Sequence, residues 1–178
     1  MDMVLRRMAD LTDAERADRL ALGQAVYPPE VAAAWPGRHL EWSVPDWVVF
    51  VRAADGALVC HVGIVLRSAL RDGVPVRVGG VAGVKTHPAA RRQGLAGRAI
   101  GRAVEFFREQ SDVAFGLLVC EPHLIGYYGR LGWQEFSGRL LVTQRGEPSE
   151  FTFNRVMTLG VRSAGPTAGT VDLCGPPW

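Results

Sequence analysis

The chain is 178 residues long, 48% hydrophobic and 21% charged, with a formal net charge of +2 at pH 7. This length favours one domain with a sizeable buried core. So small a charge argues against nucleic acid or a lipid surface as a partner, and no apolar run approaches the roughly 20 residues of a membrane-spanning helix.

The N-terminal segment predicts two helices. Thr12 and Glu15 have the spacing of a capping box, in which a hydroxyl and a carboxylate satisfy the first free amides of a helix. A helix should therefore begin here and run to about Val26, with Leu20 on its apolar side. The Pro28-Pro29 pair can open a second short helix, which should end before the next Pro-Gly pair.

Runs of β-branched, aromatic and aliphatic residues predict four strands in the first half of the chain: 4–8, 47–51, 58–70 and 74–87. Asp55-Gly56 and Asp72-Gly73 are typical of hairpin turns, so the last three of these strands should be antiparallel neighbours. Gly79, Gly80 and Gly83 lie inside the fourth strand. They predict a bulge or a close approach of another segment to the backbone.

A helix is expected from about Gly94 to Gln110, because apolar residues recur there at helical spacing. The next run, Val113 to Cys120, is almost continuously apolar. Such a strand is covered on both faces, which favours parallel pairing with the strand before the helix. Together these elements predict one βαβ unit late in the chain.

The last third predicts one more helix and a last pair of strands. The helix should start at Pro122 and end at Gly132. The strands are expected over 140–144 and 151–161. The tail, 163–178, is rich in Gly and Pro and ends at Trp178.

Between the fourth strand and the long helix lies a turn rich in small residues, which we call the phosphate cradle: Arg91, Arg92, Gln93, Gly94, Leu95, Ala96 and Gly97. The helix that follows would direct unpaired N–H groups and the positive end of its dipole at the same place. This arrangement binds phosphate groups with few side chains. The cradle therefore predicts a pyrophosphate site, although a tight helix entry has the same composition.

Residues Val84 to Trp133 resemble the core of the GNAT (Gcn5-related) N-acetyltransferase superfamily. That family carries an Arg/Gln-x-x-Gly-x-Gly/Ala signature after its fourth strand, which Arg91 to Ala96 match, and a later Tyr-x-x-x-Gly-aromatic segment, which Tyr128 to Trp133 match. The resemblance implies an α/β acyl-CoA N-acyltransferase fold spanning 1–178. Its central sheet is mixed and mostly antiparallel, with a splayed pair of parallel strands and flanking helices.

The same resemblance implies an acyltransferase enzyme with acetyl-CoA as cofactor. Its pyrophosphate would lie on the amides of the cradle, and its pantetheine arm would pair with backbone groups of Val84, Lys85 and Thr86. One of these amides would bond the thioester oxygen. Tyr128 matches the family's usual general acid for the departing thiolate, although a packed aromatic is its structural alternative.

The acceptor side has weaker signals. Glu121, at the end of the buried strand, is the best candidate for the base, and His123 is the second candidate. The structural alternative is a helix-start charge for Glu121 and a plain surface residue for His123. Glu41 and Asp46 have Trp neighbours and could line a pocket for a cation. His61, in mid-strand, is interpreted as a structural residue.

Within the superfamily, the chain from Leu58 onward is most similar to the aminoglycoside 2′-N-acetyltransferases. The shared features are the strand around His61 and a Cys-containing tail with a final Trp. This resemblance implies Asp172 and the carboxylate of Trp178 as acceptor-binding groups. One difference is that the Glu-Gly-Val step of those enzymes is replaced here by 82–84, Ala-Gly-Val, which has no carboxylate.

The favoured hypothesis is an acetyl-CoA-dependent N-acetyltransferase that acts on a primary amine of a small molecule, such as an aminoglycoside-like aminosugar. The amine would attack the thioester directly in a ternary complex. The alternatives are a non-catalytic acyl-CoA-binding regulatory module and an enzyme that acetylates a protein amine. The sequence is compatible with a homodimer as the oligomeric state. The N-terminus has no apolar signal core, and the three cysteines form no CxxC pair, so a cytoplasmic location without disulfides or a metal is expected.

Overall fold

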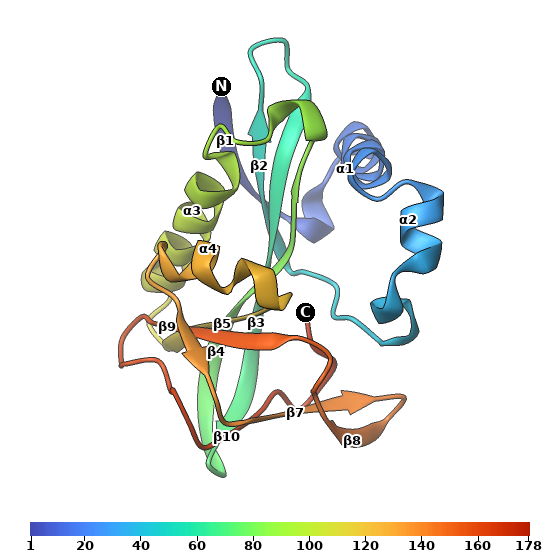
Figure 1. Ribbon diagram of the computed structural model, residues 1–178. Helices are drawn as coiled ribbons and strands as arrows, with labels where there is room; N and C mark the ends of the chain where they lie inside the picture. The colour runs from blue at the N-terminus through green and yellow to red at the C-terminus, as the bar shows by residue number, and fades with distance from the viewer.

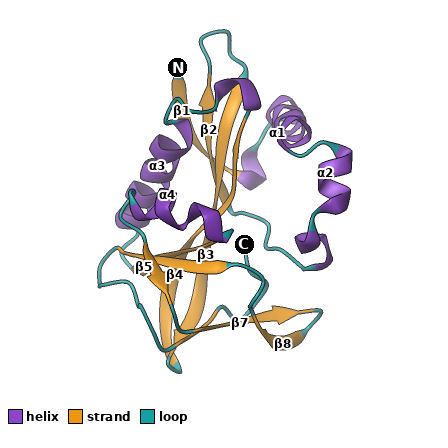
Figure 2. Ribbon diagram, viewed as in Figure 1, coloured by secondary structure: helices purple, strands orange, loops and turns teal.

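The ten strands of the computed structural model, which describes residues 1–178, form one mixed sheet (Figures 1 and 2). The strands are β1 (Asp2–Arg7), β2 (Trp47–Arg52), β3 (Leu58–Arg71), β4 (Val74–Thr86), β5 (Val113–Cys120), β6 (Gln134–Phe136), β7 (Arg139–Gln144), β8 (Glu147–Glu150), β9 (Arg155–Gly160) and β10 (Thr170–Asp172). Their order is β6-β9-β5-β4-β3-β10-β7-β8, and β2 and β1 continue from β3. This confirms the predicted fold class.

Four α-helices flank the sheet: α1 (Asp13–Val26), α2 (Pro29–Ala34), α3 (Leu95–Glu109) and α4 (Ile125–Gly129). Four 3-10 helices precede or follow them: η1 (Met8–Asp10), η2 (Pro36–His39), η3 (Pro88–Ala90) and η4 (Pro122–Leu124). In Figure 1, α3 and α4 lie on one side of the central strands and α1 and α2 on the other. No helix is long and apolar enough to cross a membrane.

The helix predicted from the capping box is α1, but its buried face was predicted wrongly. Leu20 is 63% exposed, whereas Leu22 is buried. Residues two positions apart in an α-helix are separated by about 200° around the helix axis, so the side chains of Leu20 and Leu22 point in nearly opposite directions. Leu22 packs in a small cluster with buried residues of β2 and β3.

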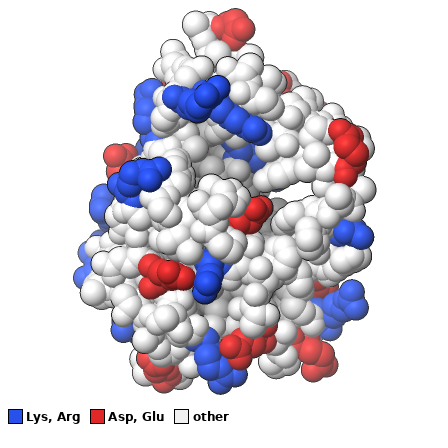
Figure 3. Space-filling view, in the orientation of Figure 1, with Lys and Arg blue, Asp and Glu red and all other residues white.

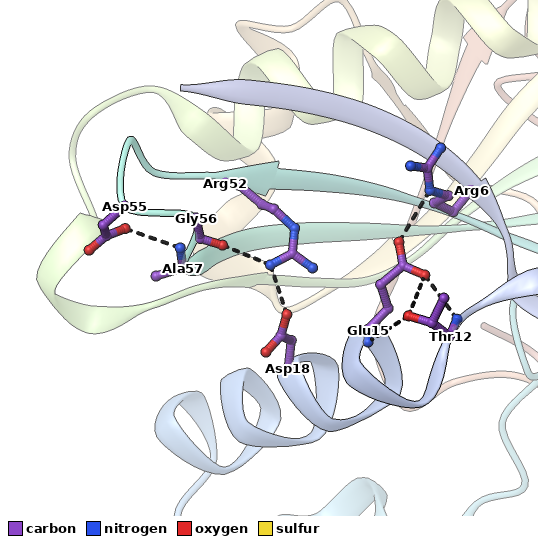
Figure 4. A network of polar contacts seen from close by, with 8 residues as sticks. All are labelled: Arg6, Thr12, Glu15, Asp18, Arg52, Asp55, Gly56 and Ala57. Carbon is purple, nitrogen blue, oxygen red and sulfur yellow. Dashed lines mark hydrogen bonds and ion pairs between the residues drawn. The ribbon is translucent and has the colours of Figure 1, made fainter.

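The start of α1 is held by the predicted capping box (Figure 4). Thr12 Oγ1 accepts a hydrogen bond from the Glu15 amide at 3.2 Å, and Glu15 Oε2 accepts one from the Thr12 amide at 2.9 Å. The Thr12 amide is the main cause that lowers the pKa of Glu15, with Arg6 adding to it. The stability that this carboxylate contributes is therefore present above its unfolded pKa and lost as the pH falls through the lower folded one.

Removal of this cap should cost a measurable amount of stability. Thr12→Ala leaves the Glu15 amide without its side-chain acceptor, so we expect the free energy of unfolding to fall by about 1 kcal/mol. Denaturant unfolding monitored by circular dichroism measures the change. Thr152→Ala, an exposed threonine outside helices and strands, is the control and should change little. Equal effects of the two substitutions would contradict the role of the cap.

The three antiparallel strands predicted from the Asp-Gly turns are β2, β3 and β4. The register of β3 and β4 shifts between the pairs His61 with Lys85 and Gly63 with Ala82, so β4 carries a bulge there. Gly83 lies in the bulge with φ +50°, a left-handed conformation that favours glycine. The bulge predicted from the glycines is thus confirmed.

The other two glycines of β4 mark close approaches on opposite faces of the sheet. A Cβ on Gly79 would overlap the ring of Phe107 in α3, and a Cβ on Gly80 would overlap the indole of Trp178. Arg67 holds the tail on this second face, since it donates to the Pro176 carbonyl and lies 5.3 Å from the centre of the Trp178 ring. The C-terminal tail is therefore packed against the middle of the sheet.

Gly80→Ala tests the packing of the tail. A methyl group would push against the buried Trp178 ring, and we expect the free energy of unfolding to fall by about 1–3 kcal/mol. The cost should largely disappear in a Trp178→Ala background, where the ring is gone. Gly101→Ala is the control, because its Cβ would meet nothing within 4 Å. An equal cost of Gly80→Ala in both backgrounds would contradict this packing.

The βαβ unit predicted late in the chain is β4-α3-β5, with the strands parallel. Buried apolar residues of α3 pack on one face of these strands. The pairing runs only from Arg77 with Val113 to Gly80 with Leu117. Beyond Gly80 the two strands separate, although β4 continues to Thr86 and β5 to Cys120. This confirms the predicted splayed pair.

The last strands pair differently from the prediction. The segments expected as a final pair are β7 and β9, but they are not neighbours. β9 lies antiparallel between β5 and β6, whereas β7 lies between β8 and β10 and is parallel to β10. The three strands missed in the sequence, β6, β8 and β10, have only 3 or 4 residues each, too few for an alternating pattern to show.

Candidate functional site

A cavity of about 440 Å³ opens where β4 and β5 separate. Its lining comes from α1, the segment around η2, the bulge of β4, the end of β5, α4 and the tail. Figure 3 shows the surface hollowed between the side of α1 and α2 and the side of α4, with basic atoms near its upper end. The volume lies in the usual range for small-molecule sites.

The phosphate cradle presents a row of free backbone amides. The first helical bond of α3 runs from the Arg98 amide to the Gly94 carbonyl. The six amides of 92–97 have no hydrogen-bond partner within the chain. Arg92 and Gly94 both have positive φ, 61° and 71°, which turns the chain sharply into the helix. The cradle thus fits an anion of the pyrophosphate kind.

The edge of β4 beyond Gly80 is free on the side of β5 and paired with β3 on the other side. Val84 and Lys85 lie on this edge and line the cavity. Thr86 is turned the other way, since its hydroxyl donates to Cys60 Sγ at 3.3 Å. An extended chain could therefore pair with the free edge as an added strand.

Tyr128, in α4, is buried and lines the cavity. Burial is the main cause that raises the pKa of its phenol well above the usual value, and Cys120 and the two tyrosines Tyr127 and Tyr27 add to it. The phenol is consequently protonated at neutral pH. It can act as a proton donor inside the cavity.

Glu121 follows β5 directly and lies at the edge of the cavity. Its side chain is exposed, and its Oε2 is 3.3 Å from Nδ1 of His123. His123 is also exposed and does not line the cavity. Of the two candidates for a base, the structure thus brings only Glu121 to the site.

The other predicted acidic residues lie outside the cavity and are bonded to backbone amides. Glu41 accepts a hydrogen bond from the Arg145 amide at 2.8 Å, and Asp46 accepts one from the Leu66 amide at 2.8 Å. Asp172 accepts from the Cys174 amide at 2.8 Å. The structure therefore does not bring these three carboxylates together with Tyr128.

Trp178 is the residue of the tail that reaches the cavity. Its indole N–H donates to the Leu117 carbonyl at 3.0 Å, at the last pair before β4 and β5 separate. Trp178 is buried and lines the cavity. The acceptor-binding role expected for the terminal carboxylate of Trp178 stays a prediction.

Three basic residues line the cavity wall: Arg19 in α1, His61 in β3 and Lys85 in β4. Sequence reasoning assigned only the backbone of Lys85 to the site, as a partner of the pantetheine arm, and assigned no functional role to Arg19 or His61. His61 is 2% exposed, and neither ring nitrogen has a hydrogen-bond partner. Burial, with Lys85 and Arg19 adding to it, lowers the pKa of His61 to about 3. A buried polar group without a partner is unusual, and this was not visible from the mid-strand position of His61.

No group of three or more His, Cys, Asp or Glu residues is arranged to hold a metal ion. The three cysteines are free thiols.

Comparison with protein families gives one match. The sequence profile described as "Acetyltransferase (GNAT) domain" matches residues 7–136, which include the cradle, the splayed strands and Tyr128. No curated protein matches the sequence. None of this bears on the narrower resemblance to aminoglycoside 2′-N-acetyltransferases, which stays a prediction.

Solved structures share the fold at low sequence identity. An acyl-CoA N-acyltransferase from Pseudomonas aeruginosa is 22% identical with a TM-score of 0.63, over 89% of this chain and 99% of that one. A GNAT family N-acetyltransferase from Escherichia coli, solved in complex with CoA, is 14% identical with a TM-score of 0.63, over 97% and 89%. A GNAT family acetyltransferase from Brucella melitensis, in complex with acetyl-CoA, is 16% identical with a TM-score of 0.58, over 96% and 94%.

Proposed function

The chain belongs to the GNAT acetyltransferase family, and from this premise we propose that it transfers an acetyl group from acetyl-CoA to a primary amine of a small molecule. The observation that carries the proposal is that Val84 and Lys85, on the free edge of β4, line the same cavity as Tyr128. The free amides of the cradle and the free edge of β4 suit the cofactor, and the buried phenol of Tyr128 lies on the cavity wall. Related structures solved with CoA and acetyl-CoA support the choice of cofactor.

In this proposal the chain binds the cofactor mainly through its backbone. The amides of 92–97 hold the pyrophosphate, with Arg91 beside them, and the edge at Val84, Lys85 and Thr86 pairs with the pantetheine arm. When bound, acetyl-CoA supplies an activated acetyl thioester. An amide of the bulged segment would donate to the thioester oxygen, a kind of contact whose loss costs about 2.7–4 kcal/mol in other enzymes.

Two side chains move protons during direct attack by the amine. Glu121 accepts a proton from the incoming amine, directly or through water, at the edge of the cavity. Tyr128 would supply its phenolic proton to the departing thiolate, whose C–S bond is replaced by the new N–C bond to the acceptor. The raised pKa of Tyr128 supports this role, because the proton is present at neutral pH.

The acceptor is proposed to be a small molecule, because the cavity has the size of a small-molecule site. The aminosugar version stays a prediction. It requires several carboxylates around a polycation. Of the predicted acidic side chains only Glu121 lines the cavity, together with Trp178, the residue that carries the terminal carboxylate. We also propose that 1–178 act as one domain with the tail, 163–178, on the acceptor side, which the position of Trp178 supports. A homodimer likewise stays a prediction.

Two measurements test the proposed function. Acetyl-CoA should raise the melting temperature in a concentration-dependent way, and thiol release should appear when an acceptable amine is added. Binding without thiol release for any amine would favour the non-catalytic alternative. Absence of any effect of acetyl-CoA on the melting temperature would contradict the proposal itself.

A further inference from the structure

Arg19, His61 and Lys85 form a basic cluster on one part of the cavity wall. The Lys85 ammonium lies 5.8 Å from the centre of the Tyr27 ring, close to α1. The Nε of Arg19 and both ring nitrogens of His61 are buried without a hydrogen-bond partner. Neither the Arg19 guanidinium nor the Lys85 ammonium forms an ion pair with an acidic group of the chain.

The charged groups near this basic cluster do not neutralise its positive charge. The groups that lower the pKa of His61, after burial, are the cations Lys85 and Arg19. Burial also lowers the pKa of Lys85, with Arg19 adding to it. The one acidic side chain on the wall, Glu121, is exposed and lies beside His123, and the terminal carboxylate of Trp178 takes part in no ion pair. Unpaired buried donors are costly, so the basic cluster is suited to an anionic group brought by a ligand.

The rest of the wall is largely aromatic. Trp35 and Trp42 stack with their ring centres 5.5 Å apart and an angle of 28° between planes, and both line the cavity. Trp178 lines it as well. Faces of this kind favour an apolar or aromatic body rather than a heavily hydroxylated one.

We propose that Arg19, His61 and Lys85 bind the carboxylate of the acceptor, so that the acceptor is an amino-acid-like molecule with an apolar or aromatic body. The inference rests on the proposed acetyl transfer and specifies its substrate. A carboxylate offers about four lone-pair sites, enough for a guanidinium, an ammonium and one imidazole N–H. With its carboxylate fixed there and its body against the tryptophans, the acceptor turns its amine toward Tyr128 and Glu121.

Three matched amines test the carboxylate: L-phenylalanine, L-phenylalaninamide and phenethylamine, each with saturating acetyl-CoA in the thiol-release assay. We expect kcat/KM for phenylalanine to exceed that for the other two by about tenfold or more. Equal values, or a preference for O-phosphoethanolamine, would overturn the carboxylate site while leaving acetyl transfer intact. A failure of acetyl-CoA to bind would instead contradict the proposed function.

Substitution of the basic cluster should change this selectivity. Arg19→Met should reduce the ratio of kcat/KM for phenylalanine to that for phenethylamine by about tenfold. Arg16→Met, on an exposed position of the same helix, should leave the ratio unchanged. An unchanged ratio in Arg19→Met would overturn the assignment.

Product binding provides a test that does not depend on turnover. Because Trp35, Trp42 and Trp178 line the cavity, ligands should change the tryptophan fluorescence. N-acetyl-L-phenylalanine should bind about tenfold more tightly than N-acetylphenethylamine, and His61→Leu should remove that difference. His61→Gln, which keeps a donor, should restore part of it. Equal binding of both products to the unsubstituted protein would overturn the inference.

Discussion

Gly94→Glu should lower the affinity for acetyl-CoA by about 10²–10³-fold. Gly94 is the residue before the first turn of α3, and a Cβ placed on it would meet nothing within 4 Å. A side chain therefore fits, but its carboxylate would lie beside the free amides of 92–97 and compete with the pyrophosphate for them. Isothermal titration with acetyl-CoA measures the loss.

Two controls separate charge from backbone strain. Gly94 has φ +71°, so any side chain at this position is strained, and Gly94→Gln carries the same strain without the charge. Gly146→Glu adds the same carboxylate to another glycine of positive φ, in the hairpin between β7 and β8. Affinity should fall far more in Gly94→Glu than in either control. Normal affinity of a folded Gly94→Glu protein would show that the pyrophosphate lies elsewhere.

The cradle could be predicted because its information is local. Seven consecutive residues, 91–97, specify the turn, the free amides and the helix start, and no distant contact is needed to recognise them. The parallel pairing of β4 and β5 was also predictable from neighbouring segments, because an apolar run after a helix favours it. The separation of these strands was implied only by the resemblance to the GNAT superfamily. Tyr128 could be assigned because the segment 128–133 matches the Tyr-x-x-x-Gly-aromatic segment of the family that the sequence resembles.

The acceptor side depends on contacts between distant elements, which local sequence patterns do not specify. The basic cluster combines residues of α1, β3 and β4. Its distinguishing feature is that buried nitrogens of Arg19 and His61 have no hydrogen-bond partner, and no local sequence pattern specifies this. Glu41 and Asp46 failed to reach the cavity for a related reason. Each carboxylate is bonded to a backbone amide of a distant segment, at Arg145 and Leu66 respectively.

Tyr128→Phe should lower kcat by about 10²–10⁴-fold while leaving the affinity for acetyl-CoA almost unchanged. The substitution keeps the buried ring and removes only the phenolic proton, so packing in α4 should persist. Stopped-flow or steady-state thiol release gives kcat, and titration gives the affinity. A variant with unaltered kcat would remove Tyr128 from the mechanism.

The pH dependence distinguishes proton donation from positioning. Since burial raises the pKa of Tyr128, the unsubstituted enzyme keeps its proton donor through the mildly alkaline range, whereas the variant must take protons from solvent, where they become scarce. The deficit of Tyr128→Phe should therefore widen as the pH rises. Tyr127→Phe, at the adjacent and partly buried ring 5.1 Å away, is the matched control and should show no such trend. A deficit that is constant with pH would mean that the hydroxyl orients the acceptor or the thioester and that the thiolate takes its proton from water.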